Sequence, residues 1–246
     1  DNVDIVVTSY NECYRNKKEA ITRFCGGKKV WQGNKEIKKL QLISMATFKN
    51  KQFNNKNFMV EWAKLYRKKL LNENKLNAIT TIRYMEDFLF NLYMFDYARK
   101  IVYKDECLYN YRRRINSIAT DDKIEKVKDY LTYIEEEKKF VNLQKKSIIF
   151  KKIHEIRTLS LIISTINQNI FTPNVKYKNG KKIVKKIIKK DDNSKVLYSI
   201  RLKYFTIYEK ICIILLRCKA YLLLKIIATI RYYIKLVKIE TSYYEK

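Results

Sequence analysis

Apolar positions follow two different periods along the first part of the chain. A Val/Ile run predicts a strand over residues 3–10, and a loop over 25–29 precedes a second short strand at 30–31. Residues 35–48 carry apolar side chains at helical spacing, and residues 60–71 repeat that spacing. The pattern therefore predicts two strands followed by two helices.

The same pattern continues to residue 147. A third helix is predicted over residues 86–97, followed by one strand at 100–103 and another at 108–111. A charged helix is predicted over 121–147, with the carboxylates of Asp121 and Asp122 capping its first amides. The side chains expected to face inward from the third helix are Phe88, Leu89, Leu92 and Phe95.

The pattern of apolar and charged residues changes after residue 154, where apolar runs alternate with basic clusters. We place a candidate boundary near residues 145–155. Residues 176–190 fit either a β-hairpin that turns at Asn179 and Gly180 or a basic helix. Sequence alone leaves both interpretations open.

Residues 209–239 predict an amphipathic helix. Their longest uncharged run, residues 211–216, is far shorter than the roughly 20 residues that cross a bilayer. This helix can lie on an anionic membrane or pack its apolar side on the rest of the protein, and both possibilities stay open. The basic residues that fall within a sector of about 140° are Lys210, Arg217, Lys225, Arg231, Lys235 and Lys238.

Composition adds a strong positive charge to this outline. The 246 residues include 53 Lys and Arg against 25 Asp and Glu, a formal net charge of +28, and the last 96 residues hold 22 of the former and 6 of the latter. Such a field attracts nucleic acid, anionic lipid or sugar nucleotides without choosing among them. Five Cys without a C-x-x-C pair, and one His, argue against zinc and indicate a reduced, cytoplasmic setting.

Three short blocks stand out in the first 120 residues. Residues 62–67 read Trp-Ala-Lys-Leu-Tyr-Arg, residues 85–90 read Met-Glu-Asp-Phe-Leu-Phe, and residues 109–118 read Tyr-Asn-Tyr-Arg-Arg-Arg-Ile-Asn-Ser-Ile. Their order and spacing resemble the second half of the family 2 inverting glycosyltransferases with a GT-A fold, where the blocks are W-x-K-L-Y-R, G-E-D-x-x-F and Y-x-Y-R-x-x-x-x-S-I. Bacterial members of that family build capsular, cell-wall or lipopolysaccharide glycans.

The resemblance implies an α/β fold. Residues 1–120 would be the acceptor-side half of a GT-A domain, residues 121–150 a charged helical connection, and residues 151–246 a basic, mainly helical region that associates with membranes. Two departures stand out, because the family's V-I-I-P-x-Y-N strand and D-x-D motif are absent and Met85 replaces a Gly. The complete family member is expected to use Mg²⁺ or Mn²⁺, whose ligands are absent from this chain. A preceding segment or a partner chain would then supply the nucleotide-binding half.

The resemblance makes Asp87 the general base, which takes the proton from the acceptor hydroxyl, while Glu86 positions the acceptor or the loop. The alternative is that Glu86 and Asp87 merely occupy the first turn of a helix, where negative charge is favoured by about 0.3–1 kcal/mol.

Acceptor binding is expected from Trp62, Lys64, Tyr66 and Arg67. Trp62 and Tyr66 are four residues apart and would share one face of the helix predicted over 60–71. An aromatic face there can stack on a sugar, or it can pack into the core.

Donor phosphate binding is expected from Arg112 and Arg114, which point the same way from a strand and suit a diphosphate. A solvated basic surface is the alternative. His154 is expected to be structural, and residues 135–137 are expected to form a solvated helix face.

Taken together, these features predict an enzyme, a glycosyltransferase that moves a sugar from a nucleotide-sugar donor to a bacterial surface glycan or lipid-linked acceptor. It would be cytoplasmic and peripheral at the inner face of the cell membrane, with an anionic membrane surface as a partner. Two alternatives remain. One is a basic nucleic-acid-binding protein, and the other is a non-catalytic scaffold at the membrane surface.

Overall fold

The computed structural model describes most of the chain and divides it into two compact units, Asp1–Thr120 (unit 1) and Asp121–Glu245 (unit 2). Both strands and helices are present, so the predicted mixed α/β architecture is confirmed. The described residues are 2–14, 17–24, 27–46, 58–74, 82–113 and 124–244, without the side chains of 191 and 238–244.

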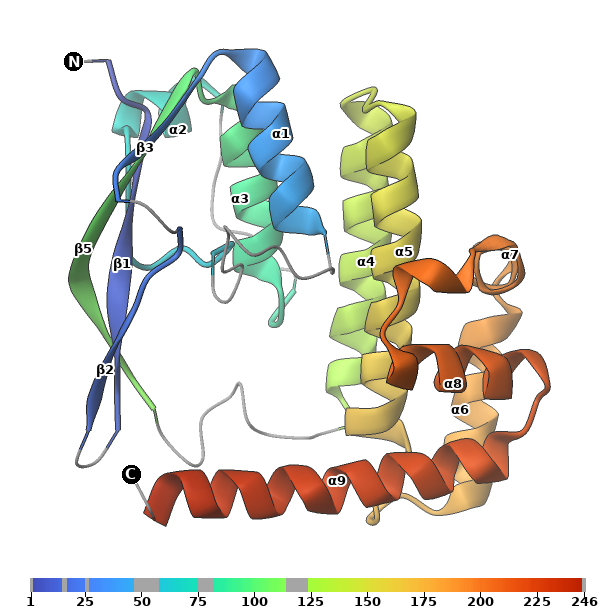
Figure 1. Cartoon of the computed structure of the whole chain (residues 1–246). Helices are drawn as coiled ribbons and strands as arrows, with labels where there is room; N and C mark the ends of the chain where they lie inside the picture. The colour runs from blue at the N-terminus through green and yellow to red at the C-terminus, as the bar shows by residue number, and fades with distance from the viewer. Residues whose placement is uncertain are drawn as a thin grey trace. The chain divides into compact units, whose positions relative to one another are not determined.

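Unit 1 is built on a five-stranded mixed sheet (Figure 1). The central pair is β1 and β5, which run parallel, and the other pairings are antiparallel. The order is β2-β1-β5-β3, and β4 pairs with β1 off this path. The strands are β1 (Ile5–Cys13), β2 (Lys18–Ile21), β3 (Lys29–Gln32), β4 (Lys64–Tyr66) and β5 (Lys100–Arg112).

Helices α1 (Asn34–Met45) and α3 (Glu86–Tyr97) lie side by side against this sheet (Figure 1). The amide Nε2 of Gln41 in α1 donates to the backbone carbonyl of Leu92 in α3 at 2.8 Å, which ties the two helices together. A short helix, α2 (Lys68–Glu73), follows β4. The strands predicted at 3–10 and 30–31 and the helix predicted over 86–97 are confirmed. The helix predicted over 35–48 is confirmed as far as Met45, and residues 47–48 lie outside the described residues.

The helix predicted over residues 60–71 is wrong. Ala63 has a left-handed φ of 56°, which no α-helix tolerates, and Lys64–Tyr66 forms β4. This segment completes the sheet by pairing with Ile5–Val7 of β1, so the tertiary hydrogen bonds override the local apolar spacing. Only Lys68–Glu73 is helical.

The two strands predicted at 100–103 and 108–111 are one strand. β5 stays paired with β1 from Ile101 to Arg112, and register shifts of β1 between Thr8 and Tyr10 absorb the polar residues in between. The polar stretch between the two apolar runs therefore marks an irregularity in a long strand.

Unit 2 is helical. α4 (Lys126–Leu143) packs against α5 (Ile148–Thr165), so the candidate boundary near residues 145–155 covers the α4–α5 connection and the start of α5, inside one unit. The proposed cap residues Asp121 and Asp122 lie outside the described residues. The remaining elements are a π-turn (Ile166–Ile170), α6 (Tyr177–Lys189), α7 (Asp191–Ser199), a 3₁₀ turn (Leu202–Tyr204), α8 (Ile207–Arg217) and α9 (Tyr221–Tyr244).

Residues 176–190, for which sequence left two interpretations, form helix α6. Gly180 lies inside this helix, against the buried ring of Phe171. A Cβ at this position would lie 2.9 Å from two ring carbons of Phe171 and 3.2 Å from the Ile170 carbonyl oxygen. Gly180 thus serves a close packing contact, and Asn179 and Gly180 form no hairpin turn.

The single amphipathic helix predicted over 209–239 is wrong in one respect. The helix is interrupted between α8 and α9, where Lys219 adopts a left-handed φ of 56°. Thr206 and Glu209 form a capping box that fixes the start of α8. Among the residues that the structure describes, no helix has the length and apolar character needed to cross a membrane.

Glu137 is fully buried, so the solvated face predicted for residues 135–137 is wrong at this position, although Glu135 is exposed. The Glu137 carboxylate accepts hydrogen bonds from the Tyr133 hydroxyl at 2.5 Å and from Arg157 Nε at 2.9 Å. His154 Nδ1 lies 2.8 Å from its other oxygen. Burial alone raises the pKa of Glu137, but Arg157 and His154 outweigh burial and the pKa is lowered overall.

Candidate functional site

The start of α3 gathers the acidic residues of the second block. Met85, at the position of the family's Gly, has φ 70° and ψ 11° and caps the helix in the left-handed region that Gly adopts most easily. The substitution therefore leaves the backbone turn in place. Glu86 and Asp87 follow in the first turn of α3, as expected for negative charge at a helix N-terminus.

Asp87 lies in a partly buried environment with charged neighbours. Burial raises the pKa of its carboxyl group, and the negative charge of Glu61 raises it further. The Lys64 ammonium and the backbone N–H groups of Asp87 and Phe88 oppose this shift, but the pKa remains raised overall. A carboxylate with raised proton affinity suits a general base.

Glu61 is a third carboxylate of this site, and sequence reasoning missed it. Burial and the nearby negative charge of Glu86 raise the pKa of Glu61, while Lys64 lowers it. Glu61 directly precedes Trp62 in the first block, so its position in the sequence was a usable signal. The helix wrongly predicted over 60–71 favoured a face that carries Trp62 and Tyr66 instead.

Lys64 is a lysine whose electrostatic surroundings include Asp87 and Glu61. Its Nζ donates to the backbone carbonyl of Phe58 at 2.5 Å and also to that of Val60. Burial and the charge of Arg23 lower the pKa of Lys64 well below its ordinary value, and the attraction of Asp87 and Glu61 only partly offsets this. Lys64 therefore fastens the loop before β4, and its pKa responds to the nearby charges of Asp87 and Glu61.

Tyr66 connects the first block to the second. Its hydroxyl donates to the side-chain carbonyl of Asn91 at 2.9 Å, and the Asn91 amide donates to the backbone carbonyl of Asp87 at 2.7 Å. The same amide also contacts the Met59 carbonyl at 3.3 Å. Burial raises the pKa of Tyr66, so this hydroxyl stays protonated and keeps its role as a donor.

Trp62 connects the first block to the third. Its ring stacks on Tyr109 and Tyr111 of β5, with centroid distances of 4.9 and 4.8 Å, and meets the edge of Tyr10 at 4.8 Å. Trp62 therefore packs on strand residues, and the helix face that it was predicted to share with Tyr66 does not exist. Trp62 is half-buried and Tyr109 is 37% exposed, so part of this aromatic stack faces solvent.

Arg23 lies behind the aromatic stack and carried no signal in the sequence. It is fully buried, and its guanidinium lies 5.1 Å from the Tyr10 ring centroid and 5.5 Å from that of Trp62. Its Nε donates to the Thr8 carbonyl at 2.8 Å. Burial lowers the pKa of Arg23 to about 10, although nearby tyrosines oppose the shift. Arg23 thus holds a positive charge beneath the site.

Arg67 is used inside unit 1. Its Nε and Nη2 donate to the Val3 carbonyl at 3.0 and 2.8 Å, and its Nε lies 3.2 Å from Asp4 Oδ1. These contacts fasten the segment before β1 to the end of β4. Arg67 is thereby a structural anchor, whatever it contributes to an acceptor.

The arginines of the third block have different surroundings. Arg112 is exposed at the end of β5, and Arg113 pairs instead with the buried carboxylate of Glu12 at 2.7 Å. Arg114 lies outside the described residues, so the predicted pair of Arg112 and Arg114 is not assembled in the part of the chain that is described. No contact recorded for the described residues joins Arg112 to Asp87.

The described residues also hold no group of three or more His, Cys, Asp or Glu side chains arranged to bind a metal ion. The Mg²⁺ or Mn²⁺ that the resemblance implies is therefore assigned no ligands here, and no step is derived through it.

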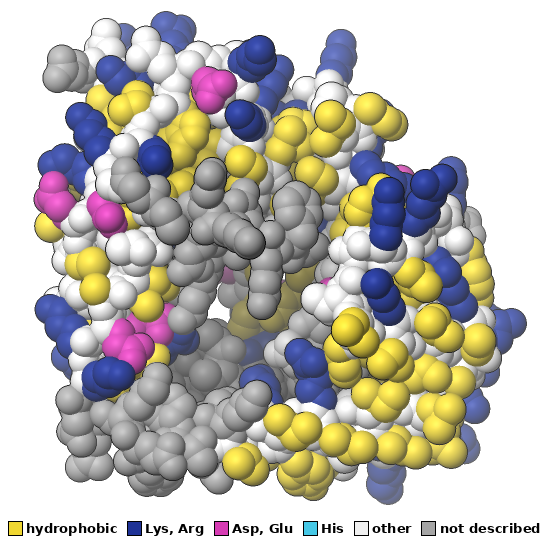
Figure 2. Space-filling view, viewed as in Figure 1, with side chains coloured by type: hydrophobic (Ala, Val, Ile, Leu, Met, Phe, Trp, Pro, Cys, Tyr) yellow, Lys and Arg dark blue, Asp and Glu magenta, His cyan; other side chains and the backbone are white. Residues whose placement is uncertain are grey.

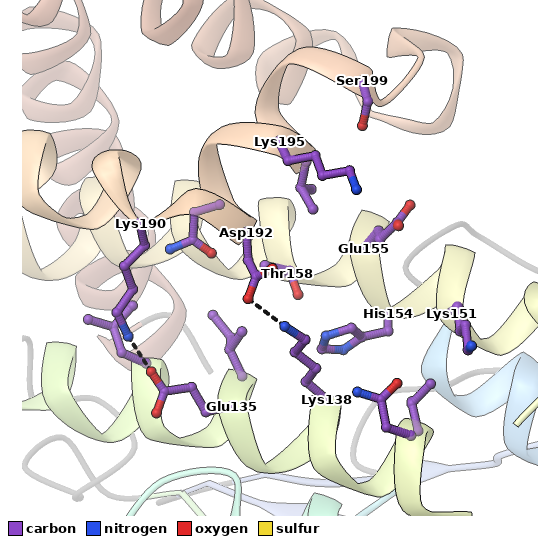
Figure 3. Close-up of a pocket in the computed structure, with 16 residues that line it drawn as sticks. Glu135, Lys138, Lys151, His154, Glu155, Thr158, Lys190, Asp192, Lys195 and Ser199 are labelled. Atoms are coloured by element: carbon purple, nitrogen blue, oxygen red, sulfur yellow. Dashed lines mark hydrogen bonds and ion pairs between the residues drawn. The ribbon is translucent and has the colours of Figure 1, made fainter. Parts of the chain in front are cut away.

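A separate pocket of about 230 Å³ lies in unit 2, between α4, α5 and α7 (Figure 3). Ion pairs join Lys138 to Asp192 and Lys190 to Glu135, and His154 also lines the pocket. Four lysines and three exposed or half-exposed carboxylates line it, so their charges nearly cancel. Such a pocket gives little preference for a diphosphate, and we place the candidate site in unit 1.

Comparison with known proteins adds no relative to this picture. No family model matches the chain, and no curated protein matches it either.

Proposed function

We propose that this chain is an inverting glycosyltransferase, and that unit 1 is the acceptor-side half of a GT-A domain. One observation carries the proposal. The three blocks, roughly twenty residues apart, converge, because Tyr66 reaches Asp87 through Asn91 and Trp62 stacks on Tyr109 and Tyr111. Motifs that matched by chance would have no reason to be linked to one another in the fold, the first block to the second by hydrogen bonds and to the third by ring stacking.

In the proposed reaction, the Asp87 carboxylate takes the proton from an acceptor hydroxyl. The hydroxyl oxygen forms a bond to the anomeric carbon of the donor sugar while the bond to the nucleoside diphosphate breaks on the opposite face. The anomeric centre is thereby inverted. The raised pKa of Asp87 supports this role, because the protonated product of the transfer is favoured there.

The acceptor is proposed to lie against the aromatic stack of Trp62, Tyr109 and Tyr111, whose apolar faces suit the C–H face of a sugar ring. The acceptor is a bacterial surface glycan or its lipid-linked precursor. We also propose that the protein works in the cytoplasm at the inner face of the cell membrane. A divalent cation would neutralise the diphosphate leaving group in the complete family member.

The test uses this chain together with the preceding segment or partner chain that supplies the nucleotide-binding half. It measures release of nucleoside diphosphate from a panel of nucleotide sugars in the presence of glycan and lipid-linked acceptors. We expect Asp87→Asn to lower the rate by about 100-fold or more, the range for loss of a general base, with an unchanged circular dichroism spectrum. Glu73→Gln is the control, because Glu73 is an exposed acid of α2 outside the site.

An Asp87→Asn variant that transfers sugar at the wild-type rate would refute the assignment. Binding of DNA that falls steeply with salt, together with no affinity for any nucleotide sugar, would support the nucleic-acid alternative instead.

A further inference from the structure

Helices α8 and α9 expose an unusual amount of apolar surface. Six residues of α9 are each between 48% and 56% exposed, and they cover a sector of about 120° on the helix. Three isoleucines of α8, Ile207, Ile211 and Ile214, are 42–78% exposed and lie on one helix face. Figure 2 shows the hydrophobic side chains gathered over both helices. The six residues of α9 are Leu222, Leu223, Ile226, Ile230, Tyr233 and Ile234.

These nine side chains form what we call the α8–α9 apolar surface. A contiguous surface of this kind on a protein marks a site of interaction with another protein or with a membrane.

The apolar sector faces outward because α9 packs through its opposite side. Tyr221, Leu224 and Ala228 are buried and are three and four residues apart, so they form one stripe. Basic residues fall on the same half of the helix and are engaged inside unit 2. Lys225 Nζ donates to the Val175 carbonyl at 2.5 Å, and the Arg231 guanidinium lies 4.0 Å from the Tyr208 ring centroid.

α9 therefore differs from an ordinary surface helix, because Lys225 and Arg231 make contacts within unit 2 while a second apolar sector is exposed to solvent. Rotating α9 about its axis to bury the apolar sector would break these internal contacts.

A lysine-rich helix lies beside the start of α9. Residues 176–190 contain eight lysines and no acid, and α6 packs against α9. Lys185 Nζ lies 5.9 Å from the ring centroid of Tyr221, the first residue of α9. Val184 and Ile187 of α6 are buried, whereas all of its lysines except the half-buried Lys181 are exposed. The exposed lysines of α6 are Lys178, Lys182, Lys185, Lys186 and Lys189.

The neighbourhood of the apolar surface is thus strongly cationic. A second copy of this chain would bring equal positive charge to the contact and would be repelled, whereas an anionic lipid surface is complementary both to the apolar face and to the lysines.

We propose that the α8–α9 apolar surface docks on an anionic lipid bilayer, with the apolar side chains at the acyl boundary and the α6 lysines among the headgroups. This inference rests on the proposed peripheral location and names the surface responsible for it. It does not rest on the transfer reaction, because none of its residues belongs to the site around Asp87.

The test is sedimentation of the full chain with lipid vesicles. One set contains phosphatidylcholine with about 30% phosphatidylglycerol, and the other contains phosphatidylcholine alone. We expect binding to the anionic vesicles and a loss of about tenfold or more for the double variant Ile226→Glu/Ile230→Glu. Substituting Lys182→Gln and Lys186→Gln should weaken binding about fivefold for each lysine removed.

The matched control is Leu143→Glu/Ile148→Glu. These residues are 73% and 77% exposed, lie in α4 and α5, and give the same change in charge and loss of apolar surface. The control should stay within about threefold of the wild type, because scattered charges act weakly across a Debye length. Circular dichroism checks that each variant is folded, and Leu222→Gln/Leu223→Gln replaces the first variant if it is not.

The inference is overturned if Ile226→Glu/Ile230→Glu binds the vesicles as tightly as the wild type. It is also overturned if the wild type does not bind the vesicles. A lipid-free dimer of the wild type that this variant dissociates would then show that the surface contacts a second copy of the chain. Vesicle binding without sugar transfer would leave the docking surface standing and refute only the proposed function. Asp87→Asn should bind vesicles like the wild type.

Discussion

Asn91 holds the side chain of Tyr66 and the backbone of Asp87 at once, accepting from the tyrosine hydroxyl at 2.9 Å and donating to the aspartate carbonyl at 2.7 Å. Asn91 is fully buried in α3, whereas Tyr66 belongs to β4. The edge of the sheet is thereby fixed to the first turn of the helix that carries the proposed base.

The first prediction concerns this bridge. Tyr66→Phe removes the donor and leaves the buried Asn91 carbonyl without it, which should lower the free energy of unfolding by about 1–3 kcal/mol. Chemical denaturation followed by circular dichroism measures the change. Tyr97→Phe is the control, because Tyr97 is exposed at the end of α3, the helix that contains Asn91. It should change the free energy of unfolding by no more than about 0.5 kcal/mol. Equal effects of the two substitutions would show that the bridge contributes nothing.

The second prediction concerns pH. Since the pKa of Asp87 is raised in the folded state, the folded protein holds this proton more tightly than the unfolded chain does. The contribution of Asp87 to the free energy of unfolding is fully present below pH 3.8, the ordinary pKa of an Asp side chain. This contribution is lost as the pH rises through the raised pKa of Asp87 in the folded protein. Asp87→Asn removes this dependence, so its stability relative to the wild type should increase from acidic to neutral pH.

Urea denaturation at a series of pH values measures both curves. Glu73→Gln controls for the loss of a carboxylate and should run parallel to the wild type. If the Asp87→Asn curve is also parallel, then Asp87 is not perturbed by its surroundings.

The third prediction concerns the buried acid of unit 2. Glu137→Gln leaves the Arg157 guanidinium buried without its partner charge and should cost about 3–5 kcal/mol. Glu135→Gln, two residues away and exposed, should cost less than about 1 kcal/mol. Because the pKa of Glu137 is lowered, its contribution is present above 4.5 and is lost as the pH falls through the folded value. Similar unfolding midpoints for the two variants would contradict the buried network.

The fourth prediction concerns Gly180. Ala is a better helix former than Gly by about 1 kcal/mol, yet Gly180→Ala places a methyl group against the Phe171 ring and should destabilise the protein by about 1–3 kcal/mol. Asn179→Ala, at the neighbouring exposed position of α6, should instead be neutral or slightly stabilising. Thermal unfolding of the two variants in opposite directions is the expected result, and a stabilised Gly180→Ala would show that the ring can move aside.

Local signals predicted some elements closely and missed others for identifiable reasons. The helix over 86–97 was located to the residue, because its acidic first turn and its apolar spacing are both properties of the segment itself. β4 was missed because its conformation is dictated by hydrogen bonds to β1, almost sixty residues earlier in the chain. Local periodicity carries no information about such a partner.

The candidate site shows the same division. Glu86 and Asp87 lie where the motif suggested, but Arg23 and Glu61 join them only through tertiary burial. Glu137 was misjudged because three successive acids look alike in sequence, whereas only one of them faces α5. The exposed apolar sector of α9 was likewise not predicted, since helical periodicity separates two faces but does not say which one is buried.

The parallel pairing of β1 with β5 has a consequence for how the chain folds. Ile5 pairs with Ile101, so the centre of the sheet joins residues about ninety-five positions apart, and the intervening chain must close as a loop before the sheet is complete. Unit 2, in contrast, is assembled largely from helices that are neighbours in sequence. On the ribosome, unit 1 cannot complete its sheet until β5 has emerged, and it should be the slower of the two units to fold.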